Sequence, residues 1–242
     1  MNKSFLLLCL TTAIAFTACN KGRDLSKERI KKMSSNRGYS TEYSYNTDGV
    51  LASTRTGEGG VTTYKREGNT ILQQYADSVH NYFINTTLYL GSNGLVDSSV
   101  THTPRGTYIK IYKHDADGYI TGTEDFNDMG VINYTQSEYK DGNQVKTTVL
   151  DTAAQPALVV YYTYDLKKQN FPAYENYGMV FLGHDSKNLV SNIIQVSSKG
   201  DTLHNNVFHY YYDDKGRINS RTIYEQDKVL MDSTNYTFND QK

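Results

Sequence analysis

The chain has 242 residues, enough for one large domain or two small ones. With 22 tyrosines, 18 glycines, 3 prolines and 38% hydrophobic residues, it is typical of a folded, turn-rich protein with a modest core rather than of a disordered one. The 25 basic and 26 acidic residues are spread without the basic stripe that a phosphate backbone requires, so nucleic-acid binding is disfavoured.

Residues 1–18 have the features of an export signal. Lys3 supplies a positive charge, and an apolar stretch follows over residues 5–16. A helix of this length is too short to cross a bilayer, which takes roughly 20 residues, but it is suitable for a signal peptide. We therefore predict that the protein is exported and that residues 1–18 are removed.

Cys19 follows this stretch directly, after the small residues Thr17 and Ala18. The arrangement resembles the lipobox of bacterial lipoproteins, in which the cysteine becomes the new N-terminus and carries acyl chains. Cys9 is the only other cysteine, so cleavage leaves one cysteine and no disulfide. We predict lipidation of Cys19, with an ordinary signal peptide and an incidental cysteine as the alternative. Several acyl chains, at ~0.8 kcal/mol per buried methylene, would anchor the protein in the bacterial envelope, and we expect the outer membrane.

The segment 19–37 is predicted to be the lipidated cysteine and a polar tether, although residues 25–33 could also form a short helix. Lipoproteins displayed on the cell surface often carry acidic residues soon after the cysteine. Here Lys21 and Arg23 precede Asp24, so the sequence leaves the membrane leaflet open.

From residue 38 to residue 242 one pattern recurs: aromatic or β-branched residues, a cluster of turn formers, then another apolar residue. The predicted turns lie at 48–49, 68–69, 93–94, 117–118, 141–142, 168–170, 187–188 and 215–216. Asp or Asn followed by Gly supplies the positive φ that tight hairpin turns need. The spacing, about 19 to 28 residues, fits one β-hairpin per repeat.

The repeats predict an all-β fold: one antiparallel meander of about 14 to 16 strands over residues 38–242, with little helix. Each strand pair twists by roughly −20 to −25°, so open sheets of this size curl, close or split. We therefore expect a strongly curved sheet or a barrel-like structure.

Alternation along the strands predicts which side chains share a face. Phe208, Tyr210 and Tyr212 share one face of residues 207–212. After the next turn, Ile218, Ser220, Thr222 and Tyr224 are predicted on one face, and Arg217, Asn219 and Arg221 on the opposite one. In residues 107–113, Ile109 and Ile111 oppose Tyr108, Lys110 and Tyr112. The sheet is thus expected to have a drier face and a face rich in tyrosine and charge.

Exposed tyrosines bind sugars and peptides by stacking and by hydroxyl hydrogen bonds. If the sheet presents a ligand face, the candidates are Tyr108, Tyr112, Tyr210 and Tyr212. The alternative for each is packing within the sheet, because tyrosine is also a good strand residue.

Two resemblances extend this interpretation. The segment "FPAYENYGMVFLGHDSKNLVSNI" (171–193), with the "YNTDGVL" and "YDDKGRI" hairpins and the lipobox, resembles a Bacteroidetes-type lipoprotein family, a domain of unknown function with a porin-like fold. The hairpin motif also distantly resembles the tyrosine–aspartate repeats of Rhs-type proteins. The family resemblance implies a barrel-like architecture and an envelope location, and it implies no catalytic residues. We do not expect a true pore, because short strands with polar residues on both faces do not suit a membrane-spanning barrel.

No motif predicts catalysis, a metal or a cofactor. "HDADG" (114–118) starts like a calcium loop, but the twelfth position, which should be glutamate, is Phe126, so a hairpin turn is favoured. The six histidines show no paired metal-ligand spacing. We therefore predict a non-enzymatic binding or interaction module with a membrane anchor and a glycan or protein ligand.

Two alternatives remain open. An envelope hydrolase acting on polysaccharide or peptidoglycan would need a cleft with two close carboxylates and a raised pKa. A scaffold would need an exposed apolar patch larger than a few hundred Å².

Overall fold

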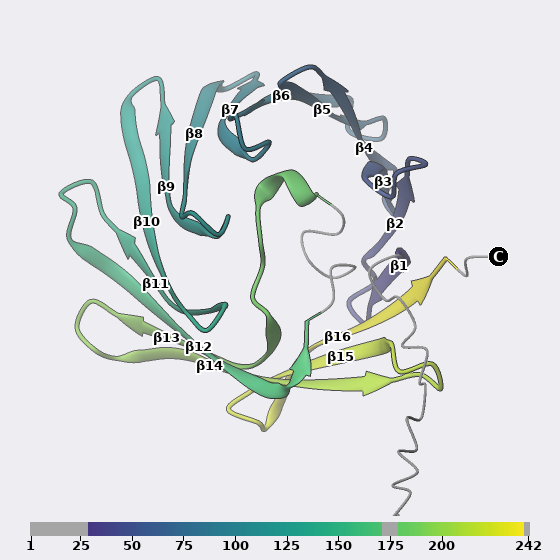
Figure 1. Cartoon of the computed structure of the whole chain (residues 1–242), viewed down its shortest axis with the longest axis vertical. Coiled ribbons are helices and arrows are strands. Elements are labelled where there is room, and N and C mark those ends of the chain that lie inside the picture. Colours follow the sequence, from purple (N-terminus) through teal and green to yellow (C-terminus); the bar gives the residue numbers. More distant parts are fainter. Residues whose placement is uncertain (1–28, 171–178, 240–242) are drawn as a thin grey trace, which may run out of the picture.

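The structure, a computed structural model, describes residues 29–170 and 179–239, except for the side chains of residues 131 and 132. The predicted signal peptide, Cys19 and residues 171–178 of the family-like segment lie outside the described residues. The described chain forms a closed barrel of 16 antiparallel strands in sequence order (Figure 1). The predicted all-β meander is confirmed.

The first eight strands are β1 (Ile30–Ser35), β2 (Ser40–Tyr45), β3 (Leu51–Thr56), β4 (Gly60–Glu67), β5 (Thr70–Asp77), β6 (Tyr82–Leu90), β7 (Val96–Thr103) and β8 (Gly106–His114). The other eight are β9 (Ile120–Asn127), β10 (Gly130–Lys140), β11 (Asn143–Leu150), β12 (Pro156–Gln169), β13 (Asn188–Ser197), β14 (Thr202–Tyr212), β15 (Ile218–Glu225) and β16 (Val229–Phe238). A three-residue 3₁₀ turn, η3 (Val180–Leu182), lies between β12 and β13. None of the described residues forms a helix long and apolar enough to cross a membrane.

Strand β1 closes the barrel. Met33 on β1 pairs with Thr41 of β2 on one side and with Tyr236 of β16 on the other. The strand lies within residues 19–37, the segment predicted as a tether, so the folded domain begins before residue 38. No turn motif precedes β1, and its two partners lie at opposite ends of the chain. Only closure of the sheet shows that it is a strand.

The predicted turns gather at one end of the barrel, which we call the motif end. It carries the turns 46–50, 68–69, 91–95, 115–119, 141–142 and 213–217. Their glycines all have positive φ, as the pattern predicts: Gly49, Gly68, Gly94, Gly118, Gly142 and Gly216. The described chain also starts and stops at this end, where Arg29 Nε donates to Gly49 O at 2.8 Å and Asn239 N donates to Arg29 O at 3.1 Å. We call the opposite end the open end.

The two remaining predicted turns, near 168–170 and 187–188, are not separate hairpins. Asn170 N donates to Lys187 O at 2.8 Å, so the two positions are neighbours. They are the two ends of a single long connection between β12 and β13. Its described part, residues 179–187, runs inside the ring of strands (Figure 1).

This inserted segment organises the hydrophobic core. Phe181 is 5% exposed and packs in a buried cluster formed with Ile71, Leu88, Leu90 and Val96. A second buried cluster consists of Ile30, Tyr43, Leu51, Leu189, Ile218 and Tyr236. Met179 packs against both clusters. Most of these residues lie at or near the strand ends that adjoin the motif end, so the core occupies that half of the barrel and leaves the other half for polar side chains.

Candidate functional site in the barrel lumen

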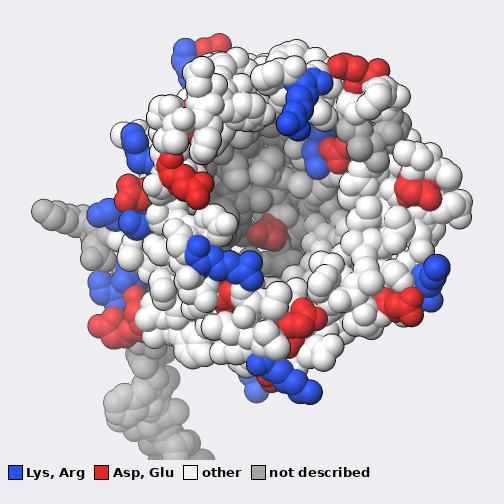
Figure 2. Space-filling model, turned by 180° about the vertical axis from the view of Figure 1, so that it is seen from behind, with Lys and Arg blue, Asp and Glu red and all other residues white. Residues whose placement is uncertain are grey.

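The barrel is deeply hollowed from one end, and the visible walls of the hollow are mostly neutral, with an acidic side chain at the bottom (Figure 2). The interior contains three spaces. The first hollow lies along β5–β10, the second hollow lies along β1, β2 and β13–β16, and an inner cavity lies beside the inserted segment. We call them together the lumen.

The first hollow has a volume of about 530 Å³. Its wall carries Gln73, Thr86, Leu88, Ser99, Thr101, Tyr108, Lys110, Tyr112, Asp125 and Asn133 among its lining residues. The one cation, Lys110, is paired with Asp125 at 3.2 Å and lies 5.8 Å from the ring of Tyr112. The tyrosine-rich face of β8 therefore points inward, and Ile109, which is 40% exposed, also borders the hollow.

The second hollow, of about 640 Å³, is more highly charged. Ser35 and Thr234 donate hydrogen bonds of 2.6 and 2.9 Å to the carboxylate of Asp232. Burial opposes ionisation of Asp232, but these hydrogen bonds and the charge of Arg221 lower its pKa on balance. Glu225 accepts a hydrogen bond from Asn205 N at 3.0 Å and pairs with His204 at 3.5 Å.

The inner cavity, of about 210 Å³, is lined by four tyrosines: Tyr162, Tyr164, Tyr210 and Tyr236. Tyr164 donates to Gln144 O at 2.7 Å and lies 2.8 Å from Ser186 Oγ, and burial raises its pKa to about 12. Tyr210 donates to Val190 O at 2.9 Å, and burial also raises its pKa. These hydrogen bonds connect the side chains of Tyr164 and Tyr210 to the backbone of the barrel wall, so both tyrosines have a structural role.

Asp185 is the acidic residue of the inner cavity. Much of its surface is accessible, yet it lies deep enough among the barrel walls that burial raises the pKa of its carboxyl. Ser186 N donates to its Oδ1 at 2.9 Å, which opposes the shift only in part.

The four predicted ligand tyrosines do not form one face. Tyr108 and Tyr112 line the first hollow on β8, and Tyr108 is 38% exposed. Tyr210 lines the inner cavity on β14. Tyr212 packs against a core cluster, with Lys168 Nζ 4.5 Å from its ring. Strands β8 and β14 are far apart in the strand order, so the two pairs belong to different walls. Ligand contact stays a prediction for all four.

Arg221 lines both the second hollow and the inner cavity, which the sequence did not predict. Alternation placed Arg221 on the face opposite Ile218, but both residues line the inner cavity, so this assignment was wrong. The cause is a β-bulge: Tyr212 pairs with Ile218 and Tyr211 with Ser220, which leaves one extra residue on β15. Nothing in the local pattern marks the bulge.

Other sequence candidates have structural roles. In the 114–118 segment, Asp115 Oδ1 accepts hydrogen bonds from Asp117 N at 3.0 Å and Tyr119 N at 2.9 Å, as expected for the hairpin turn favoured over a calcium loop. His209 pairs with Asp227 at 2.9 Å and packs edge-on against Tyr224. Within residues 29–170 and 179–239, no three His, Cys, Asp or Glu side chains are grouped to hold a metal ion.

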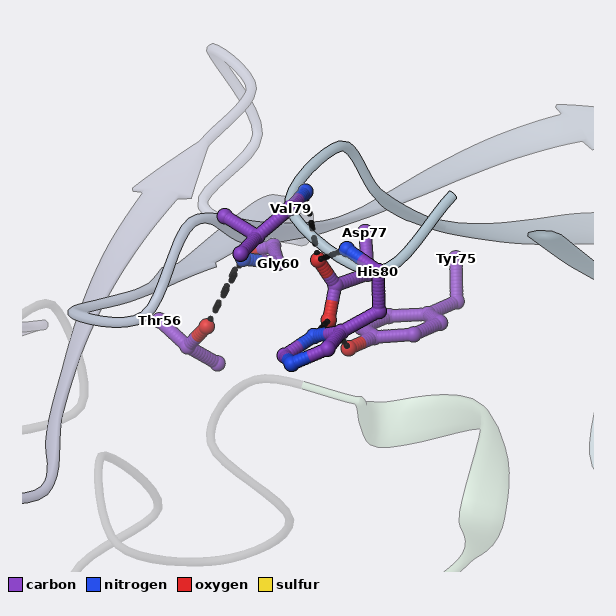
Figure 3. Close-up of polar contacts among 6 residues, drawn as sticks. All are labelled: Thr56, Gly60, Tyr75, Asp77, Val79 and His80. Carbon is purple, nitrogen blue, oxygen red and sulfur yellow. Dashed lines mark hydrogen bonds and ion pairs between the residues drawn. The ribbon is translucent and has the colours of Figure 1, made fainter. Parts of the chain in front are cut away.

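A histidine–aspartate pair lies in the β5–β6 turn at the open end (Figure 3). Asp77 Oδ1 accepts from Val79 N at 2.9 Å and His80 N at 3.1 Å, while Oδ2 lies 2.7 Å from His80 Nδ1. The hydrogen bond and charge of Asp77 raise the pKa of His80. Tyr75 donates to the same carboxylate at 3.4 Å. All of these contacts converge on Asp77 from its own turn, so the group is a turn cap rather than a catalytic array.

Comparisons with known proteins give the architecture. No protein-family profile matches the chain, and no curated protein matches it. The structure is similar to a porin-like protein from Bacteroides uniformis ATCC 8492, with a TM-score of 0.62 and 14% identity over 87% of this chain and 96% of that one. It is also similar to a porin-like protein from Bacteroides vulgatus ATCC 8482, with a TM-score of 0.65 and 15% identity over 88% of this chain and 100% of that one.

Identities this low show the fold alone. They agree with the porin-like architecture that the sequence resemblance implied. Lipoprotein status and the likeness to Rhs-type repeats stay predictions.

Proposed function

We propose that this porin-like barrel is a lipid-anchored envelope protein that binds a glycan in its lumen without catalysis. The observation that carries the proposal is the chemistry of the lumen wall. Hydroxyl side chains of neighbouring strands pair along it: Thr86 and Thr101 both line the first hollow, with their Oγ1 atoms 2.8 Å apart. Neutral hydroxyl and amide groups with an exposed tyrosine such as Tyr108 are the groups that sugars bind by hydrogen bonding and stacking.

The packing of the barrel supports a closed cup rather than a pore. Phe181 and its cluster fill space inside the motif end. On the outer wall, Lys113 pairs with Glu124, and Lys146 pairs with Glu138 at 2.7 Å. A lysine on the lipid face of a membrane-spanning barrel costs roughly 2–4 kcal/mol at the midplane. Such pairs favour a barrel that lies outside the bilayer and is surrounded by water.

The charges of the lumen support binding over hydrolysis. A glycoside hydrolase needs two carboxylates that act together across the scissile bond. The pKa of Asp185 is raised by burial, and no second carboxylate contributes to the shift. Asp185 is the one carboxylate among the described residues that line the inner cavity, so it can hydrogen-bond a ligand there but does not supply the pair that glycoside hydrolysis requires.

The predicted anchor would orient the lumen. Arg29 is bonded to the motif end, and the residues between Cys19 and Arg29 reach at most roughly 35 Å when extended. A lipid on Cys19 would therefore hold the motif end nearer the membrane and turn the open end away from it. An opening directed away from the bilayer is suited to a soluble or wall-bound glycan.

A glycan array followed by calorimetric titration tests the binding function. Tyr108→Ala is expected to weaken the binding of the best glycan at least about tenfold, because the stacking and hydroxyl contacts of Tyr108 are lost. The matched control is Tyr211→Ala, since Tyr211 is 50% exposed and lies on β14 with its side chain directed away from the lumen. Absence of glycan binding, or equal losses in both variants, would remove the proposal.

The anchor has a separate test. Cys19→Ser is expected to abolish acylation, seen by mass spectrometry of the mature N-terminus, and to release the protein from the membrane fraction. Membrane association that persists unchanged in Cys19→Ser would contradict lipid anchoring while leaving the lumen proposal in place.

A further inference from the structure

We infer that Arg221 binds a carboxylate of the lumenal ligand, so that the glycan is acidic and carries a uronic-acid type of sugar. The inference rests on the proposed glycan function and specifies the class of its ligand. It starts from the position of Arg221, which lies on β15 opposite Tyr210 of β14 and Thr234 of β16. The side chain lines both the second hollow and the inner cavity, so it stands where the two spaces adjoin.

Arg221 has no acceptor. No hydrogen bond or ion pair joins it to any residue that the structure describes, and its Nε is out of contact with solvent. A cation–π contact with Phe208 is weak, because the guanidinium carbon lies 5.9 Å from the centre of the ring. A guanidinium has five N–H donors, and a partly buried one is normally paired. The unpaired donors therefore point to a partner from outside the chain.

The two acids that line the second hollow with Arg221 form no ion pair with it. Asp232 accepts the two hydroxyl hydrogen bonds from Ser35 and Thr234, and Arg221 acts on it only through its charge. Glu225 Oε1 accepts from Asn205 N, while its buried Oε2 accepts no hydrogen bond and lies 3.5 Å from His204 Nδ1. Neither acid lies within ion-pair distance of Arg221. The guanidinium is thus held in the lumen wall by packing alone, with its terminal nitrogens available to a ligand.

The chemistry of the ligand follows from the guanidinium. Its planar fork matches a carboxylate in a bidentate arrangement. The rest of the lumen wall offers hydroxyls, amides and tyrosines, which recognise the sugar itself. The first hollow does not provide an equivalent cation, because Lys110 is paired with Asp125 there. A saccharide that enters the second hollow would therefore present its carboxylate to Arg221.

The test uses matched probes on the full-length protein: an array of galacturonate, glucuronate and sialylated oligosaccharides, each beside its methyl ester, followed by calorimetric titration. The ester keeps the sugar and removes the negative charge. We expect an acid to bind and its ester to bind roughly 10- to 100-fold more weakly, because a charge-assisted bidentate contact is lost.

Arg221→Gln should abolish the preference for the acid, and Arg221→Lys should restore part of it. Arg55→Gln, on the exposed outer face of β3, controls for the loss of one positive charge. Because Arg221 makes no hydrogen bond to a described residue, its variants should stay folded; circular dichroism and thermal unfolding of each variant separate binding from folding, and Arg221→Lys keeps the charge that acts on Asp232.

The outcomes are distinguishable. If acid and ester bind equally well, the inference about Arg221 is overturned and glycan binding stands. If acids are preferred but Arg221→Gln keeps the preference, the inference is also overturned. If no oligosaccharide binds, both the inference and the proposed function fall.

Discussion

Phe181→Ala tests whether the inserted segment is part of the cooperative core. Phe181 is 5% exposed and packs inside the barrel with Ile71, Leu88, Leu90 and Val96. Truncation to alanine removes the ring from this cluster and leaves a cavity, because strands fixed by their ladder bonds can collapse only partly into the space.

The expected loss is large for one residue. Substitution of a buried phenylalanine by alanine typically costs about 3–5 kcal/mol. A domain with a total stability of about 5–15 kcal/mol would lose a substantial fraction of it. The matched control is Val180→Ala, because Val180 is adjacent in sequence and 62% exposed, and a surface change of this kind stays within about 0.5 kcal/mol.

Urea unfolding, followed by tyrosine fluorescence and far-ultraviolet circular dichroism, measures both variants. The chain has 22 tyrosines and no tryptophan, so tyrosine is the natural optical probe. A loss below about 1 kcal/mol for Phe181→Ala, or equal losses for the two variants, would refute the reasoning. The inserted segment would then rest loosely in the barrel, and the closed-cup interpretation would fail with it.

Three further predictions concern the inserted segment, the mouth of the barrel and its closure. Gly183→Ala should destabilise the fold more than Gly200→Ala, measured by thermal unfolding, because both glycines have positive φ but the Cβ added at Gly183 would clash with the backbone oxygen of Gly118, whereas the one at Gly200 meets no described atom. By NMR titration His80 should show a pKa above 6.5 that falls in Asp77→Asn; the stabilising effect of this pair is present below pH 6.5 and is lost as the pH rises through the raised pKa. A chain shortened to begin at residue 38 lacks β1 and should aggregate in size-exclusion chromatography, because two strand edges are exposed, whereas a chain that begins at residue 29 should stay folded.

Local chemistry accounts for the parts of the fold that could be predicted. In the "YYYDDKGRI" turn, Asp213 Oδ1 accepts from Lys215 N at 3.0 Å and Arg217 N at 2.8 Å, and Gly216 has positive φ. Each of these contacts joins residues within a few positions of one another, so the residue types alone indicate the turn. The same reasoning found the other hairpins of the motif end and the all-β class.

The candidate site could be predicted only in part. Tyr108 and Tyr112 line the lumen, as alternation along one strand suggested, because no bulge interrupts that part of β8. Arg221 was placed on the wrong face, because one extra residue in β15 reverses the alternation between Ile218 and Arg221. The site therefore depends on register, which one residue can change.

The sequence by itself determined where the chain turns and that it extends between the turns, since those properties reside in short-range contacts and backbone preferences. Only the tertiary structure decided that β1 joins β16, that residues 179–187 lie inside the barrel, and which side chains face the lumen. These features pair groups far apart in the chain, such as Ser35 with Asp232 at 2.6 Å. Their free energy depends on strand number, stagger and packing, which exist only after the sheet has closed.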